Sequence, residues 1–84
     1  MMGGYRLAIA KRAEKFIERQ PAKQQTRLLQ AISGLPTTGD IKPLAGIVGG
    51  FRLRVGDYRV IYEFDALELT VKVKNIGNHG DVYK

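Results

Sequence analysis

The sequence predicts an α+β domain in which two helices cover one face of an antiparallel-type sheet. Three observations support this prediction. Apolar residues recur every three to four positions in the first half of the chain, they alternate with polar residues from Gly50 to Tyr62, and a two-residue Gly-Asp break divides that alternating stretch. The first pattern is typical of amphipathic helices and the other two of a β-hairpin. The 84 residues are enough for a single domain, 1–84, with one modest core.

The N-terminal part predicts one strand followed by a helical hairpin. Tyr5–Ala10 alternates apolar and polar side chains, which indicates a short strand. From Lys11 the period changes to that of a helix, Pro21 stops this helix, and a second helix is expected from about Ala22 to Leu35. Because so short a turn joins them, the two helices should pair in antiparallel fashion. Their apolar stripes consist of Ala13, Phe16 and Ile17 in the first helix and Leu28, Leu29, Ile32 and Leu35 in the second.

The segment Pro36–Gly49 is interpreted as a loop, because it holds two prolines and several glycines. Leu44 and Ile47 are expected to anchor it to the core. Lys42 could add one positive charge near the sheet, although a plain connection is the favoured interpretation of this segment.

The hairpin is expected to turn at Gly56 and Asp57, and a two-residue turn fixes the register of its strands. On one face Arg54 then lies opposite Arg59. Like charges that face each other destabilise a strand pair by roughly a few tenths of a kcal/mol, so an anion is expected to bind there. The other face is apolar, with Val55 opposite Tyr58, Leu53 opposite Val60, and Phe51 opposite Tyr62.

A third strand, Leu67–Ile76, is expected after a second two-residue break at Asp65 and Ala66. This register would place Lys72 opposite Arg59 in a three-strand meander. The helices must cover the apolar face of the sheet, which leaves the basic face open. We interpret the open face as a surface that binds a polyanion, and an ordinary solvated sheet face is the alternative. The five cations of that face are Arg52, Arg54, Arg59, Lys72 and Lys74.

Composition narrows the classes of function. The net charge of +6 and the pI near 9.9 suit nucleic acid or an acidic protein as partner. The chain has no cysteine and one histidine, His79, so neither a structural metal site nor a cofactor is expected. No apolar run approaches the roughly 20 residues of a membrane span, and the N-terminus lacks the apolar core of a signal peptide. A soluble cytoplasmic protein is therefore the default expectation.

The tail Asn75–Lys84 leaves the third strand and could fold back over the same sheet. His79 and Tyr83 are its two side chains suited to proton transfer in a tuned site. The alternatives are a surface histidine and an aromatic side chain packed on the edge of the domain.

The stretch FRLRVGDYRVIYEF, the alternating strand after it and the terminal IGNHGDVYK resemble the RelE/ParE superfamily of bacterial toxins, and its RelE branch in particular. The order of elements agrees over nearly the whole chain. The resemblance implies a RelE-like fold and a ribosome-dependent endoribonuclease that cuts mRNA in the ribosomal A site. It also implies a cognate antitoxin that keeps the toxin silent.

The resemblance implies roles for particular residues as well. The basic positions of the first hairpin strand correspond to Arg52 and Arg54, the arginine after the turn to Arg59, and the near-terminal tyrosine to Tyr83. The tail departs from the family pattern, because His79 stands where relatives usually carry arginine. Lys42, Lys72 and Lys74 are assigned to RNA binding.

The expected chemistry is metal-independent cleavage by the RNA 2′-hydroxyl, which yields a 2′,3′-cyclic phosphate and a 5′-hydroxyl. Arginines suit the dianionic transition state because they stay charged and bind phosphate oxygens bidentately. They are poor bases for the same reason, so His79 is expected to move the proton and Tyr83 to stack on a base or position the hydroxyl.

Three alternatives remain open at this point. ParE-like members share the fold but inhibit DNA gyrase by binding, and fold alone does not settle function. A basic nucleic-acid-binding module without chemistry would show the same open cations. The altered tail also fits a catalytically weakened RelE homologue.

Overall fold

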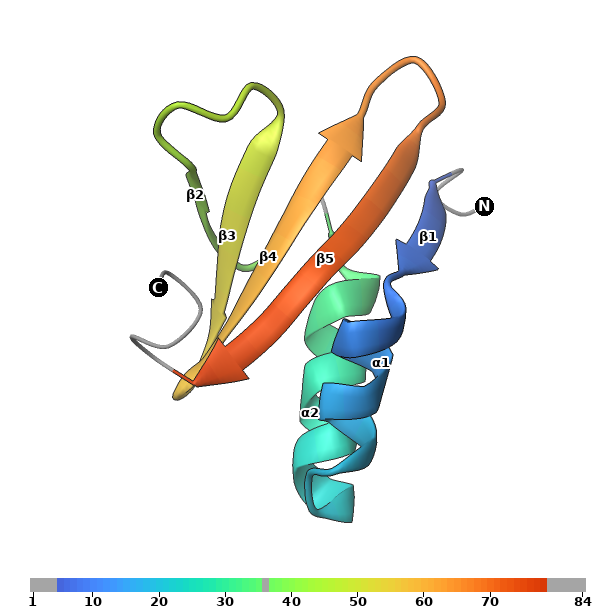
Figure 1. Ribbon diagram of the computed structural model, residues 1–84, viewed down its shortest axis with the longest axis vertical. Coiled ribbons are helices and arrows are strands. Elements are labelled where there is room, and N and C mark those ends of the chain that lie inside the picture. The colour runs from blue at the N-terminus through green and yellow to red at the C-terminus, as the bar shows by residue number, and fades with distance from the viewer. Residues whose placement is uncertain (1–4, 36, 79–84) are drawn as a thin grey trace.

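The computed structural model describes residues 5–35 and 37–78 and places two helices against a five-stranded sheet (Figure 1). This confirms the predicted α+β class. In chain order the elements are β1 (Arg6–Ile9), α1 (Lys11–Glu18), α2 (Ala22–Ser33), β2 (Asp40–Pro43), β3 (Gly50–Val55), β4 (Tyr58–Asp65) and β5 (Thr70–Asn78).

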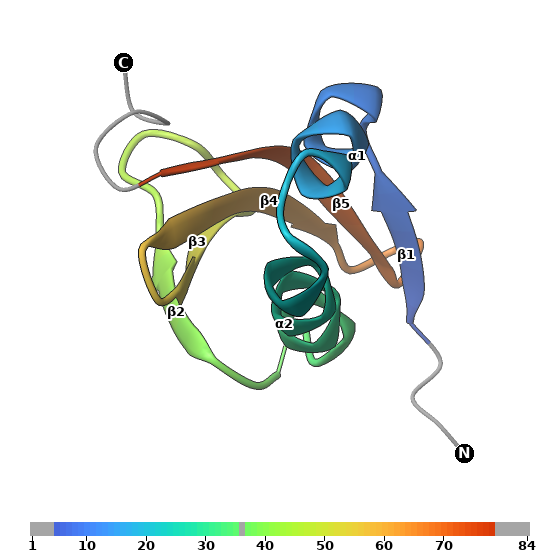
Figure 2. The ribbon, with the colours of Figure 1, turned by 90° about the horizontal axis from the view of Figure 1, so that it is seen from below.

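The two helices form the predicted hairpin, and their apolar stripes face the sheet. Ala13 and Ile17 of α1 and Leu28 and Ile32 of α2 are buried, whereas Leu29 is 46% exposed and lies off the core. The buried side chains form one cluster with core residues of β3, β4 and β5. Figure 2 shows α2 within the curve of the sheet, so one sheet face is covered and the other points away from the helices.

The strand order is β1-β5-β4-β3-β2, with three antiparallel pairings and one parallel pairing. The expected meander corresponds to β3, β4 and β5. The sequence left the position of the first strand open, and the structure pairs β1 with β5 in parallel, Arg6 opposite Thr70 and Ile9 opposite Val73. The sheet is therefore mixed rather than purely antiparallel.

The interpretation of Pro36–Gly49 as a loop is wrong for Asp40–Pro43, which forms the edge strand β2. The strand has four residues, and Pro43 closes it at an edge, where a missing backbone donor is tolerated. So short a strand gives no clear periodicity. Ile41 of β2 is half-buried against the core, while Leu44 is half-buried and Ile47 is 50% exposed.

The β3–β4 hairpin has the predicted two-residue turn and the predicted register. Gly56 has a φ of +58°, as the first central residue of a type II′ turn requires. A Cβ at this position would lie 2.7 Å from Nη2 of Arg27, so a guanidinium of α2 lies against the turn.

The helical hairpin is docked onto the same end of the sheet. Tyr58 Oη donates a hydrogen bond of 2.9 Å to Gln20 Oε1, and the Tyr58 ring packs edge-on against Phe16 with centroids 5.8 Å apart. Gln25 Nε2 donates to the carbonyl of Gln20 at 2.8 Å and holds the turn between the helices. These contacts fix the β3–β4 turn relative to the helices.

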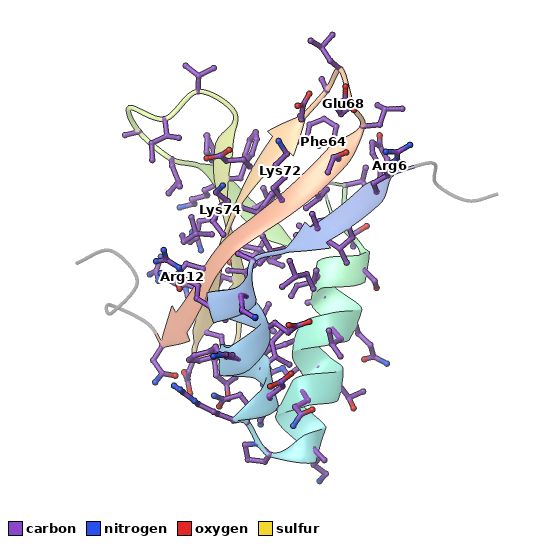
Figure 3. All side chains as sticks on the ribbon, turned by 45° about the vertical axis from the view of Figure 1, so that its right-hand side comes forward. Arg6, Arg12, Phe64, Glu68, Lys72 and Lys74 are labelled. Atoms are coloured by element: carbon purple, nitrogen blue, oxygen red, sulfur yellow. The ribbon has the colours of Figure 1, made fainter. Side chains whose placement is uncertain are left out.

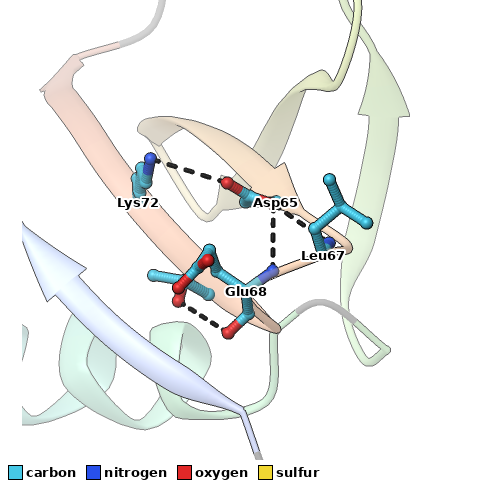
Figure 4. A network of polar contacts seen from close by, with 5 residues as sticks. Asp65, Leu67, Glu68 and Lys72 are labelled. Atoms are coloured by element: carbon cyan, nitrogen blue, oxygen red, sulfur yellow. Dashed lines mark hydrogen bonds and ion pairs between the residues drawn. The ribbon is translucent and has the colours of Figure 1, made fainter.

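The expected second break is wrong in length. Asp65 belongs to β4, and four residues, Ala66–Leu69, precede β5. The carboxylate of Asp65 accepts the backbone N–H groups of Leu67 at 3.0 Å and Glu68 at 3.1 Å, as Figure 4 shows. Such local side-chain bonds stabilise a turn that strand periodicity does not reveal.

Among the residues that the structure describes, no helix combines the length and apolar character that a membrane span requires.

Candidate nucleic-acid interface

The sheet face that points away from the helices carries charged side chains on four neighbouring strands. Residues directly opposite each other in adjacent strands share a face, so the register identifies the members of this surface. We call it the charged face. It comprises Asp40 and Lys42 of β2, Arg52 and Arg54 of β3, Arg59, Ile61 and Glu63 of β4, and Lys72 of β5.

Arg54 and Arg59 face each other next to the β3–β4 turn, as the sequence predicted. Arg54 is exposed and Arg59 is half-buried. The β5 residue opposite Arg59 is Gly77, which brings no side chain to the site. Two arginines are therefore cross-strand neighbours on a short stretch of sheet, and paired arginines are residues that suit a phosphate.

Arg52 lies on the charged face but is not open to solvent. Its side chain is only 8% exposed, so the expectation of an uncovered cation is wrong at this position. Its Nη2 lies 4.0 Å from Oδ1 of Asp40. Asp40 is in turn the β2 residue opposite Arg54, so one carboxylate stands beside two of the predicted site arginines.

The predicted row of Arg54, Arg59 and Lys72 does not form. Because the β4–β5 turn is two residues longer than expected and the register shifts between Ile61 and Tyr62, Lys72 lies opposite Glu63. Its Nζ also lies 3.9 Å from Oδ2 of Asp65 (Figure 4). Two carboxylates thus offset the charge of Lys72.

The two remaining lysines of the prediction are exposed. Lys42 lies opposite Arg52 at the β2 edge. Lys74 occupies the irregularity of β5, between the residues that pair with Ile61 and Tyr62. Figure 3 shows Lys72 and Lys74 along β5. Both exposed lysines fit contacts to a polyanion at the margin of the face rather than within the arginine pair.

Sequence reasoning missed Asp40 and Arg27. Asp40 was hidden because its segment was interpreted as a loop, and a four-residue strand is too short to show clear alternation. Arg27 lies outside the apolar stripe of the second predicted helix, so the periodicity did not mark it as a site residue. Its contact with Gly56 depends on how α2 docks, which no local pattern encodes.

His79 and Tyr83, the predicted proton-transfer residues, lie outside the described residues. Among those described, burial raises the pKa of Tyr62 above its usual value near 10. Tyr62 is opposite Phe51 and Val73 on the helix-covered face, and its ring stacks on Phe51 with centroids 5.5 Å apart. It is a core residue and not part of the charged face.

An open groove of about 280 Å³ lies at the other end of the sheet, between the loop before β3 and the β4–β5 turn. Its lining combines aliphatic side chains with charges of both signs. Val48 and Leu67, both highly exposed, line this groove. The remaining lining residues are Gly49, Glu63, Phe64, Asp65, Ala66 and Lys72. The two carboxylates make this groove unsuited to a phosphate.

Comparison with known protein families gives a match over most of the chain. The family model described as "ParE toxin of type II toxin-antitoxin system, parDE" matches residues 7–83. No curated protein sequence matches the chain.

Solved structures of RelE proteins share the fold. A chain of the archaeal RelE–RelB complex from Pyrococcus horikoshii OT3 superposes with a TM-score of 0.77 at 26% identity, covering 92% of this chain and 97% of that one. The isolated E. coli RelE toxin superposes with a TM-score of 0.75 at 20% identity, covering 95% of this chain and 92% of that one. A chain of the RelBE2 toxin–antitoxin complex from Mycobacterium tuberculosis superposes with a TM-score of 0.75 at 23% identity, covering 96% of this chain and 98% of that one.

Proposed function

Since this chain belongs to the ParE toxin family of type II toxin–antitoxin systems, within the RelE/ParE superfamily, we propose that it is a ribosome-dependent endoribonuclease. It cuts mRNA in the ribosomal A site and so inhibits translation. The observation that supports this activity best is the Arg54–Arg59 pair, two arginines face to face on the sheet face that the helices leave uncovered.

The pair fits the electrostatics of RNA cleavage. The 2′-hydroxyl oxygen attacks the adjacent phosphorus, the bond to the 5′-oxygen breaks, and the products are a 2′,3′-cyclic phosphate and a 5′-hydroxyl. Negative charge on the phosphate oxygens rises in the transition state. Guanidinium groups on neighbouring strands suit that charge, since they stay ionised and bind phosphate oxygens bidentately. His79 and Tyr83 supply the proton transfers in this proposal.

A cognate antitoxin holds the enzyme silent in the cell. The P. horikoshii and E. coli RelE chains were solved as complexes with RelB. A partner with an acidic segment would complement the Arg54–Arg59 pair and the net charge of +6. Co-expression with a neighbouring small acidic protein should restore growth that this chain alone arrests.

The second candidate is inhibition of DNA gyrase by binding, which the ParE description of the matching family favours. One pair of measurements separates the two functions. We expect cleavage of mRNA on translating ribosomes and unchanged supercoiling by gyrase. Inhibition of supercoiling with intact mRNA would instead establish the ParE-like function.

A further inference from the structure

Asp40 is an acidic residue on the charged face, directly beside the proposed site. It begins β2, lies opposite Arg54 in the register, and places Oδ1 4.0 Å from Nη2 of Arg52. Its own side chain is 56% exposed, whereas that of Arg52 is 8% exposed. An exposed carboxylate thus forms an ion pair with a buried guanidinium.

The burial of Arg52 explains why such a carboxylate is required. A guanidinium keeps its charge at any ordinary pH, and a buried charge is costly unless an opposite charge or hydrogen bonds compensate it. Lys42, directly opposite Arg52, has the wrong sign. Among the described residues, Asp40 is the ion-pair partner that Arg52 has.

The length of the contact limits what Asp40 does. At 4.0 Å it is an ion pair and not a hydrogen bond, for which about 2.7 to 3.2 Å is usual. Asp40 therefore attracts the guanidinium by charge without a direct hydrogen bond. The same negative charge, opposite Arg54, opposes the approach of a phosphate.

We propose that Asp40 is a positioning residue, whose charge keeps the Arg52 guanidinium at the place on the charged face that cleavage needs, while the same charge weakens RNA binding. This inference rests on the proposed endoribonuclease function. Loss of the Asp40 charge then affects two quantities, the affinity for RNA and the rate constant of cleavage. RNA binding tightens while the chemical step slows.

The test is single-turnover cleavage of ribosome-bound mRNA by Asp40→Asn, an isosteric change that removes only the charge. We expect the maximal rate constant to fall on the order of 10- to 100-fold, as misplacement of a catalytic group does, while the half-saturating concentration decreases. Asp57→Asn is the matched control, since Asp57 is an exposed carboxylate in the nearby turn. It should cleave at the wild-type rate.

Two further variants show whether Asp40 acts through Arg52. Asp40→Glu retains the charge and should recover most of the rate. In an Arg52→Ala background, Asp40→Asn should cause no additional loss of rate, since the group that it positions is absent. Thermal unfolding of each variant confirms that the protein is folded.

Several outcomes would overturn the inference. They are cleavage by Asp40→Asn at the wild-type rate, a half-saturating concentration that does not decrease, or full additivity with Arg52→Ala. If wild-type protein itself leaves ribosome-bound mRNA intact, the proposed function fails and this inference fails with it.

Discussion

The two ends of the sheet both carry basic residues, but they differ in the residues that lie opposite them. At the β3–β4 end, Arg54 and Arg59 face each other beside a tight glycine turn. At the β4–β5 end, Lys72 faces Glu63 and pairs with Asp65 beside a longer turn. Both ends carry an exposed cation, but the β4 residue opposite Arg54 is an arginine, whereas the β4 residue opposite Lys72 is a glutamate. The count of basic residues in a strand therefore says less about anion binding than the identity of the residues opposite them.

The largest expected difference between the ends is in catalysis. Arg54→Ala should reduce single-turnover cleavage of ribosome-bound mRNA by about 100- to 1,000-fold, the usual loss when one preorganised donor to a developing charge is removed. Lys72→Ala should change it by less than about threefold, since an exposed, ion-paired lysine contributes little. Equal losses in the two variants would show that the whole strand face, and not one end, binds the substrate.

The two turns should also differ in the sign of their response to substitution. Gly56→Ala should lower the free energy of unfolding by about 1 to 2 kcal/mol, because an L-residue is strained at the φ of +58° and the new Cβ meets Arg27. Leu69 also has a positive φ, +51°, so Leu69→Gly should raise that free energy slightly, by up to about 1 kcal/mol. Urea denaturation measures both changes, and a gain from Gly56→Ala would contradict the turn geometry.

The smallest effect concerns RNA affinity at the β4–β5 end. In the double variant Glu63→Gln, Asp65→Asn, Lys72 loses its two carboxylates, while the side-chain amide oxygen introduced by the second change can still accept the turn hydrogen bonds. Binding of a short single-stranded RNA should tighten by up to about fivefold at low salt and return to the wild-type value as screening increases. Fluorescence anisotropy measures it, and unchanged low-salt affinity would mean that RNA does not reach this end.

The β3–β4 hairpin could be predicted because its turn is local. A glycine at the first turn position and two residues between alternating runs leave one register, and all of the predicted pairs of this hairpin form. The β4–β5 register could not be predicted in the same way. It depends on the Asp65 carboxylate bound to two backbone amides and on an irregularity near Lys74, neither of which changes the alternation of the sequence.

The candidate site was predicted in part. Alternation identifies which face Arg52 and Arg54 share, but it does not report that one is buried and the other exposed. Asp40 was missed because a four-residue edge strand among glycines and a proline resembles a loop. The roles of His79 and Tyr83 remain predictions from the sequence.

The parallel pairing of β1 with β5 has a consequence for the order of folding. The first strand of the chain has its sheet partner in the last strand, and α1 also packs on β5. Contacts so distant in sequence close large loops and slow folding. During synthesis, β1 and α1 must therefore wait until β5 has left the ribosome. Under the proposed function, a nascent chain that lacks β5 is expected to leave the ribosome that makes it unharmed, because its sheet is still incomplete.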